Sequence, residues 1–179
     1  MAVNDSVPNT PTIHHSTTPM TRTIIVGLGN DLLADDAVGI HVVRQLKQEL
    51  TDEWIDIVEC SAHGLAIMDL FIDYDRAILV DALVTGKHPP GTIVEIPVET
   101  LRSVPNPSPH FAGVPEMVAL AEQLGVNYPD EFHILGVEVA DPFTLGGDLH
   151  PAVRAAIPSL CRRVCDLLNP AEIEETMVV

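Results

Sequence analysis

Three residues whose side chains could bind a metal or move a proton stand at informative places in the chain: Asp36, Asp81 and His110. Asp36 comes at the start of an expected first helix, Asp81 follows four apolar residues of a buried strand, and His110 lies in a proline-rich loop. Two carboxylates and one imidazole suit a divalent transition metal such as nickel, zinc or manganese. Because three protein ligands leave coordination positions open, such a site would admit water or substrate.

The elements that must position these residues alternate as in an α/β domain with a mixed sheet. The expected strands are 23–29, 54–60, 76–83, 92–98 and 131–139, and the expected helices are 35–50, 64–73, 116–124 and 151–168. The carboxyl ends of parallel strands line the binding crevice in open α/β sheets, so we expect Asp36 and Asp81 to converge there. A short Gly- and Pro-rich segment joins the third and fourth strands, which predicts that this pair is antiparallel.

Each candidate residue also has a structural interpretation. Asp35 is expected to cap the first helix, which leaves the adjacent Asp36 free to point into the crevice. Asp81 is as well explained by a structural role, as a hydrogen-bond acceptor for loop backbone, as by a functional one. His110 is a candidate metal ligand only because the two carboxylates could bind the same ion. His63, after the second strand, is the reserve candidate.

The glycines near the first strand indicate close packing and not nucleotide binding. Gly27 and Gly29 suggest a dinucleotide fingerprint, but its third glycine would fall at Leu32, so the motif is broken. We expect these two glycines to permit a tight turn. Gly39, inside the first helix, is expected to let that helix approach the sheet closely.

Composition restricts the partners. The net charge is −17, with 9 Lys+Arg against 26 Asp+Glu, which argues against nucleic acid and anionic membranes. No segment is long and apolar enough to span a bilayer, and three cysteines imply no disulfide framework, so a cytoplasmic location is expected. We expect flexible tails at 1–22 and 169–179 around one domain at 23–168, and a monomer.

The motifs taken together resemble the maturation endopeptidases of [NiFe]-hydrogenases. The matching stretches occur in the family's order: G-L-G-N-D-L-L-A-D-D-A-V-G-I-H-V, I-L-V-D-A-L, S-P-H and H-I-L-G-V-E. The resemblance implies a three-layer α/β/α sandwich of the phosphorylase/hydrolase-like kind, with a five-stranded mixed sheet. It also implies an aspartic-type peptidase that removes the C-terminal extension of the hydrogenase large-subunit precursor after nickel insertion. By this resemblance, Asp36, Asp81 and His110 would contact nickel carried by the precursor, Asp36 and Asp81 would also serve catalysis, and no organic cofactor is needed.

One departure from the family pattern keeps alternatives open. Many members have an acidic residue followed by two glycines at the end of the second strand, where this chain has Glu59-Cys60-Ser61. The departure leaves room for a non-catalytic module that binds nickel or the precursor. The opening V-G-L-G-N also resembles peptidyl-tRNA hydrolase, although the acidic charge disfavours tRNA as a ligand.

Overall fold

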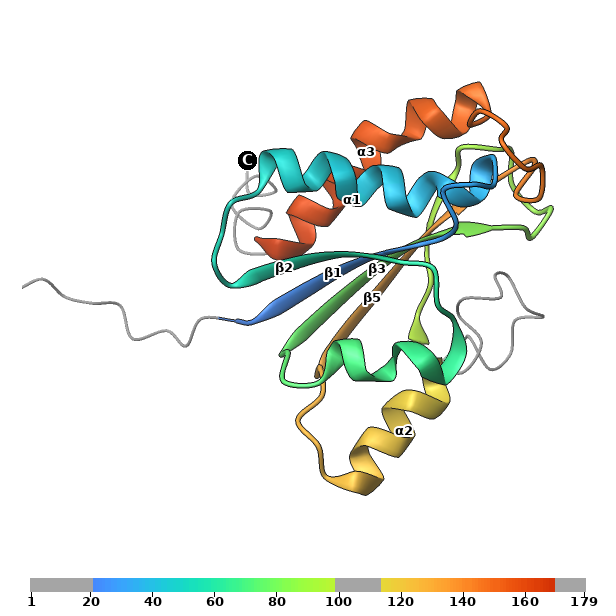
Figure 1. Ribbon diagram of the computed structural model, residues 1–179. Helices are drawn as coiled ribbons and strands as arrows, with labels where there is room; N and C mark the ends of the chain where they lie inside the picture. Colours follow the sequence, from blue (N-terminus) through green and yellow to red (C-terminus); the bar gives the residue numbers. More distant parts are fainter. Residues whose placement is uncertain (1–20, 99–113, 170–179) are drawn as a thin grey trace, which may run out of the picture.

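The computed structural model describes residues 21–98 and 114–169, which form one mixed sheet with helices on both faces (Figure 1). The expected tails and the loop that contains His110 lie almost wholly outside these residues. The strands are β1 (Thr23–Leu28), β2 (Ile55–Cys60), β3 (Arg76–Leu83), β4 (Ile93–Glu95) and β5 (Glu131–Glu138). The helices are the 3-10 helices η1 (Asp35–Ala37) and η2 (Gly64–Phe71) and the α-helices α1 (Val38–Glu49), α2 (Val114–Leu124) and α3 (Pro151–Leu168).

The strand order is β2-β1-β3-β5-β4, and only β4 runs antiparallel to its neighbour within the described sheet. The expected three-layer architecture and the single antiparallel strand are therefore confirmed. The expected pairing of the third and fourth strands is wrong, because β4 pairs with β5 and β5 lies between them. β5 pairs with β3 along eight residues, whereas β4 has only three, so the longer strand takes the inner position.

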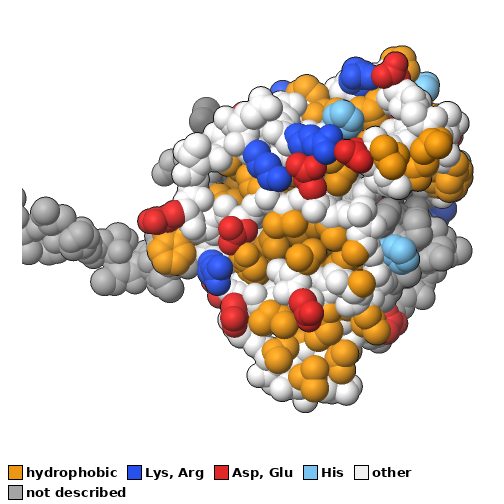
Figure 2. Space-filling model, viewed as in Figure 1, with side chains coloured by type: hydrophobic (Ala, Val, Ile, Leu, Met, Phe, Trp, Pro, Cys, Tyr) orange, Lys and Arg blue, Asp and Glu red, His pale blue; other side chains and the backbone are white. Residues whose placement is uncertain are grey.

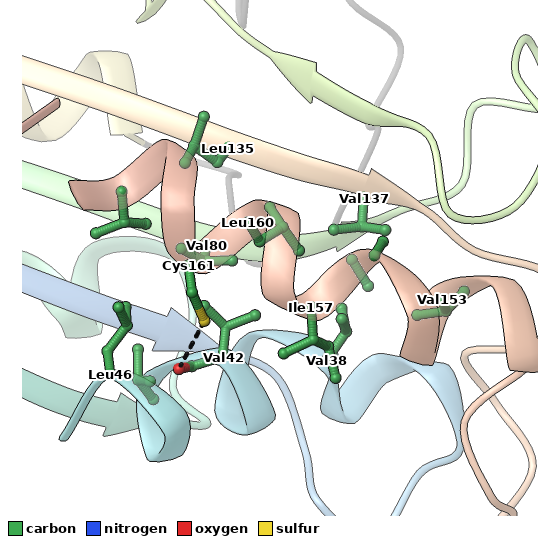
Figure 3. Close-up of a cluster of buried hydrophobic side chains, with 14 of the residues drawn as sticks. Val38, Val42, Leu46, Val80, Leu135, Val137, Val153, Ile157, Leu160 and Cys161 are labelled. Atoms are coloured by element: carbon green, nitrogen blue, oxygen red, sulfur yellow. Dashed lines mark hydrogen bonds between the residues drawn. The ribbon is translucent and has the colours of Figure 1, made fainter. Parts of the chain in front are cut away.

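One apolar layer fills the space between the sheet and the helices α1 and α3 (Figure 3). It consists of aliphatic side chains from both helices and from the inner strands, among them Val38, Val42, Leu46, Val80, Leu135, Val137, Val153, Ile157 and Leu160. The Cys161 thiol lies 3.9 Å from the backbone oxygen of Val42 in the same layer. Packing of an apolar helical stripe, not helix propensity alone, holds these helices in place.

The opposite face of the sheet is covered by η2 and α2 (Figure 1). Side chains of the inner strands, such as Ile24 and Leu79, meet Ile67 and Phe71 of η2 and Met117 of α2. The segment expected as a helix at 64–73 is thus helical, but it is a 3-10 helix that ends at Phe71. No helix in the described ranges is long and apolar enough to cross a membrane.

Candidate functional site

The two central strands end side by side and place one candidate carboxylate at the carboxyl edge of the sheet. Gly27 of β1 is in register with Val80 of β3, so Asp81 lies level with the end of β1. The Asp81 side chain is fully buried, and its Oδ1 accepts the backbone N–H of Ala82 at 2.8 Å. A buried carboxylate is held by its partners, so Asp81 is a rigidly positioned group.

Close helix packing brings the other candidate carboxylate to the same edge. A Cβ on Gly39 would lie 2.4 Å from the Val80 oxygen, and a Cβ on Gly27 would lie 2.2 Å from the Gly39 oxygen. Both separations are shorter than any real contact, so these positions admit only glycine without a shift of the backbone. The expected close approach at Gly39 is therefore confirmed. It holds the start of α1, and with it Asp36, over the ends of β1 and β3.

Asp36 is held by the turn that follows β1. Its Oδ2 accepts the backbone N–H of Asn30 at 2.8 Å, and the residue is only 8% exposed. Gly29 adopts a φ of +138°, and a Cβ there would lie 2.0 Å from the Asp36 backbone oxygen. The V-G-L-G turn is therefore shaped to receive the first turn of the helix, as expected for a tight turn and not for a nucleotide site.

Asp35 does not cap the first helix, contrary to expectation. Its Oδ2 accepts backbone N–H groups of Ala140 and Asp141 at 3.1 and 3.0 Å, and its Oδ1 accepts that of His150 at 2.6 Å. The carboxylate is fully buried. Asp35 thus fastens the loop between β5 and α3 against the start of η1, because three N–H groups of that loop converge on it.

A cavity of about 180 Å³ opens beside Asn30, at the carboxyl ends of β1 and β2. It is lined by Gly29, Asn30, Asp31, Ile40, Arg44, Glu59, Cys60 and Ser61. Polar lining residues and access from solvent make this cavity suitable for a peptide backbone or a polar side chain. The three residues of the sequence departure, Glu59-Cys60-Ser61, are all part of its wall.

An ion-pair network forms one side of this cavity. Arg44 donates to Oε2 of Glu59 through Nε at 3.0 Å and to Oδ2 of Asp31 at 2.9 Å, and the Lys47 ammonium lies 3.2 Å from Oε1 of Glu59. The hydrogen bond from Arg44 is the main reason that the pKa of Glu59 lies below its ordinary value. Glu59 therefore stays ionised at neutral pH and is held against α1.

The candidate histidines are not gathered into a metal site among the described residues. His110 lies outside the described residues, and among the described ones no group of three His, Cys, Asp or Glu side chains is arranged to hold a metal ion. His63, the reserve candidate, is exposed just before η2. His150 caps α3 by accepting the Ala152 N–H at 3.2 Å.

Comparison with known proteins supplies the family. A family model described as hydrogenase maturation protease matches residues 40–167. The chain belongs to the hydrogenase maturation protease family. The hydrogenase 2 maturation protease of Escherichia coli K12 is 27% identical over 161 residues, which is 86% of this chain and 94% of that protein. The hydrogenase expression/formation protein HupD of Rhizobium leguminosarum is 30% identical over 79% of this chain and 71% of its own length.

The solved structures agree with this assignment. The E. coli hydrogenase maturating endopeptidase HybD superimposes with a TM-score of 0.73 at 26% identity, over 84% of this chain and 93% of HybD. The family membership and this match identify the present maturation protease as a peptidase with the expected α/β fold. They favour that activity over the peptidyl-tRNA hydrolase considered from the V-G-L-G-N opening.

Sequence reasoning missed part of the site in this maturation protease. The pairing of Arg44 and Lys47 with Glu59 was not predicted, although the two basic residues, three apart on the polar stripe of the first helix, were a usable signal. Asp31 was likewise overlooked, and it joins the same network through Arg44. Asp31, Arg44 and Glu59 line the cavity, whereas Asp36 and Asp81 are buried at the strand ends.

Proposed function

We propose that this maturation protease removes the C-terminal extension of a [NiFe]-hydrogenase large-subunit precursor once nickel has been inserted. The observation that carries the proposal is the placement of Asp36 beside the ends of β1 and β3, where Asp81 also lies. The two carboxylates come from residues 45 positions apart in the sequence, and both lie at the carboxyl edge of the sheet. Family membership supplies the peptidase activity.

Nickel in this proposal is cargo of the precursor, and the protease recognises it. Asp36, Asp81 and His110 are proposed to contact the ion, because carboxylate and imidazole ligands suit nickel and leave positions for the ligands of the precursor. The backbone N–H of Asn30 orients the Asp36 carboxylate, which limits the reorganisation needed when the ion arrives. A precursor without nickel lacks this contact and is not positioned for cleavage.

Peptide hydrolysis needs a group that accepts a proton from water as the oxygen attacks the scissile carbonyl. A carboxylate can take that proton and return it to the departing amine, which is the aspartic-type mechanism. Asp36 is the better placed of the two candidates, because it is 8% exposed whereas Asp81 is completely buried. Asp81 then helps to hold the ion and fixes the geometry around it.

The test is a processing assay with nickel-loaded and nickel-free precursor, read by intact mass. Wild-type protein should release the extension from the loaded precursor only. Asp36→Asn, Asp81→Asn and His110→Ala should each slow release at least about a hundredfold. Asp130→Asn is the matched control, because this exposed aspartate precedes β5 at the opposite edge of the sheet and should process normally.

Two results would contradict the proposal. Normal cleavage by a folded Asp36→Asn protein would remove Asp36 from the site. A stable complex with the loaded precursor, with no peptide released, would instead identify a binding module.

A further inference from the structure

The outer strand β2 presents unused backbone hydrogen-bonding groups. The N–H of Thr23, at the start of β1, and that of Gly29, just after its end, donate to the oxygens of Trp54 and Cys60. Even-numbered residues of β2 therefore face β1, and the backbone groups of Ile57 and Glu59 face away from the sheet. No other described residue bonds to these outward groups. Ile55, the remaining outward residue, donates its N–H to the Asp52 oxygen at 3.2 Å, so the N–H groups open to an extended peptide are those of Ile57 and Glu59.

Apolar side chains flank this edge. Val58 and Cys60 on one face of β2 are only half-buried, and Leu65 of the neighbouring η2 is 58% exposed. Figure 2 shows hydrophobic side chains gathered over β2 and η2, below the charged side chains of α1. An added strand would thus pack alternate side chains against η2, while the others would lie beside Arg44 and Lys47 of α1.

The edge leads directly into the candidate site. Glu59 and Cys60, the last residues of β2, line the cavity together with Asn30. Asn30 is the residue whose N–H holds Asp36. A peptide that lies along β2 therefore reaches the catalytic edge at its end.

We propose that β2 binds the extension of the precursor as an added strand. This inference rests on the proposed function and names the subsite that binds the extension of the precursor. A peptide is the favoured occupant because only an extended chain matches the spacing of the outward N–H and C=O groups. A second copy of this protein is disfavoured because each copy carries a net charge of −17.

The proposal fixes the direction and the length of the bound segment. The extension lies C-terminal to the scissile bond, so it leaves the site and runs along β2 toward Ile55, antiparallel to that strand. β2 has six residues, so about six residues of the extension should contribute to binding. Residues farther from the scissile bond should contribute little.

The first test is substitution by proline at Ile57. Proline removes the outward N–H but leaves the bonds to β1 intact, because those come from even-numbered residues. Ile57→Ala is the matched control, since it loses the side chain and keeps the N–H. With nickel-loaded precursor, kcat/KM of Ile57→Pro should fall about tenfold below that of Ile57→Ala, the effect of one lost hydrogen bond.

The second test uses wild-type protein and remains decisive if Ile57→Pro does not fold. Amide exchange in residues 55–60 is followed by mass spectrometry with a nickel-loaded precursor whose residue after the scissile bond is proline, to resist cleavage. Exchange at two amides, those of Ile57 and Glu59, should slow when this precursor binds. Precursors whose extension is shortened to two or three residues should no longer protect these two amides. When such a precursor is cleavable, its processing should show a raised KM.

The outcomes separate the two proposals. If wild-type protein releases no peptide from loaded precursor, the proposed function fails and this inference fails with it. If wild-type processes the precursor while exchange at 55–60 is unchanged and the shortened extension is cut equally well, only the β2 subsite is refuted. The β2 subsite would also be refuted if the amides of residues 55–60 were protected without precursor and one of two further results held. The first is a dimer in sedimentation, which would make a second copy the occupant of β2. The second is loss of the protection when residues 1–20 are deleted, which would make that segment the occupant.

Discussion

Asp35 and Asp36 are adjacent carboxylates with separate roles, and asparagine at each position should separate stability from processing. Asp35 accepts three backbone N–H groups, two on Oδ2 from Ala140 and Asp141 and one on Oδ1 from His150. Asp36 accepts the N–H of Asn30 on one oxygen, which an amide oxygen can also do. We therefore expect Asp35→Asn to destabilise the fold and Asp36→Asn to leave it folded but inactive.

The magnitude follows from the donors around Asp35. Asparagine has one accepting oxygen, so its NH₂ group must face at least one backbone donor. The least costly orientation turns NH₂ toward His150, loses that bond and retains two weaker neutral bonds in place of charge-assisted ones. A bond to a charged group contributes about 1.5–3 kcal/mol, and a neutral one about half as much. We expect a loss of about 3–6 kcal/mol, which lowers Tm by roughly 6–24 °C.

The assay combines thermal unfolding by circular dichroism, urea titration and the processing reaction, for both variants and the wild type. Asp35→Asn should melt well below wild type, and Asp36→Asn should melt near it while releasing no peptide. A Tm for Asp35→Asn within about 2 °C of wild type would refute the three-donor account. Normal processing by Asp36→Asn would refute the division of roles.

Three further predictions concern other parts of the molecule. Gly39→Ala should cost about 1–3 kcal/mol in urea unfolding despite the better helix propensity of alanine, and a gain in stability would contradict the close packing. Burial raises the pKa of the Cys161 thiol to about 11. Iodoacetamide at pH 8 should therefore modify Cys161 at least about a hundredfold more slowly than half-buried Cys60. Equal modification rates of the two cysteines in peptide mapping would contradict the burial of Cys161. The hydrogen bond from Arg44 holds the pKa of Glu59 below its ordinary value, and stability gained this way is present above the unfolded pKa and lost as pH falls through the folded one. Arg44→Gln should therefore be less stable than wild type at pH 7 and equally stable near pH 3; a difference independent of pH in urea titrations would exclude the pairing.

Local patterns were sufficient to predict most of the architecture. The expected strands at 23–29 and 76–83 became β1 and β3, and the four apolar residues before Asp81 predicted correctly that β3 is buried. Helical glycine predicted close packing at Gly39, because its only advantage there is the missing side chain. These features depend on residue type and spacing, which the sequence states directly.

Contacts between distant segments decided the rest. Position in the helix made Asp35 a plausible cap, but N–H donors more than 100 residues away bind its carboxylate. Likewise, the short link after β3 predicted strand direction correctly, while only the competition between β4 and β5 for the inner position determined which strands pair.

The sequence by itself determined the family, the α/β alternation and the candidate carboxylates Asp36 and Asp81, because these follow from motifs and periodicity. Only the tertiary structure showed the Arg44–Glu59 network, the cavity beside it and the open edge of β2. The physical reason is that packing across the whole domain selects the partner of a side chain and the neighbour of a strand. The local sequence does not specify which distant group that partner is.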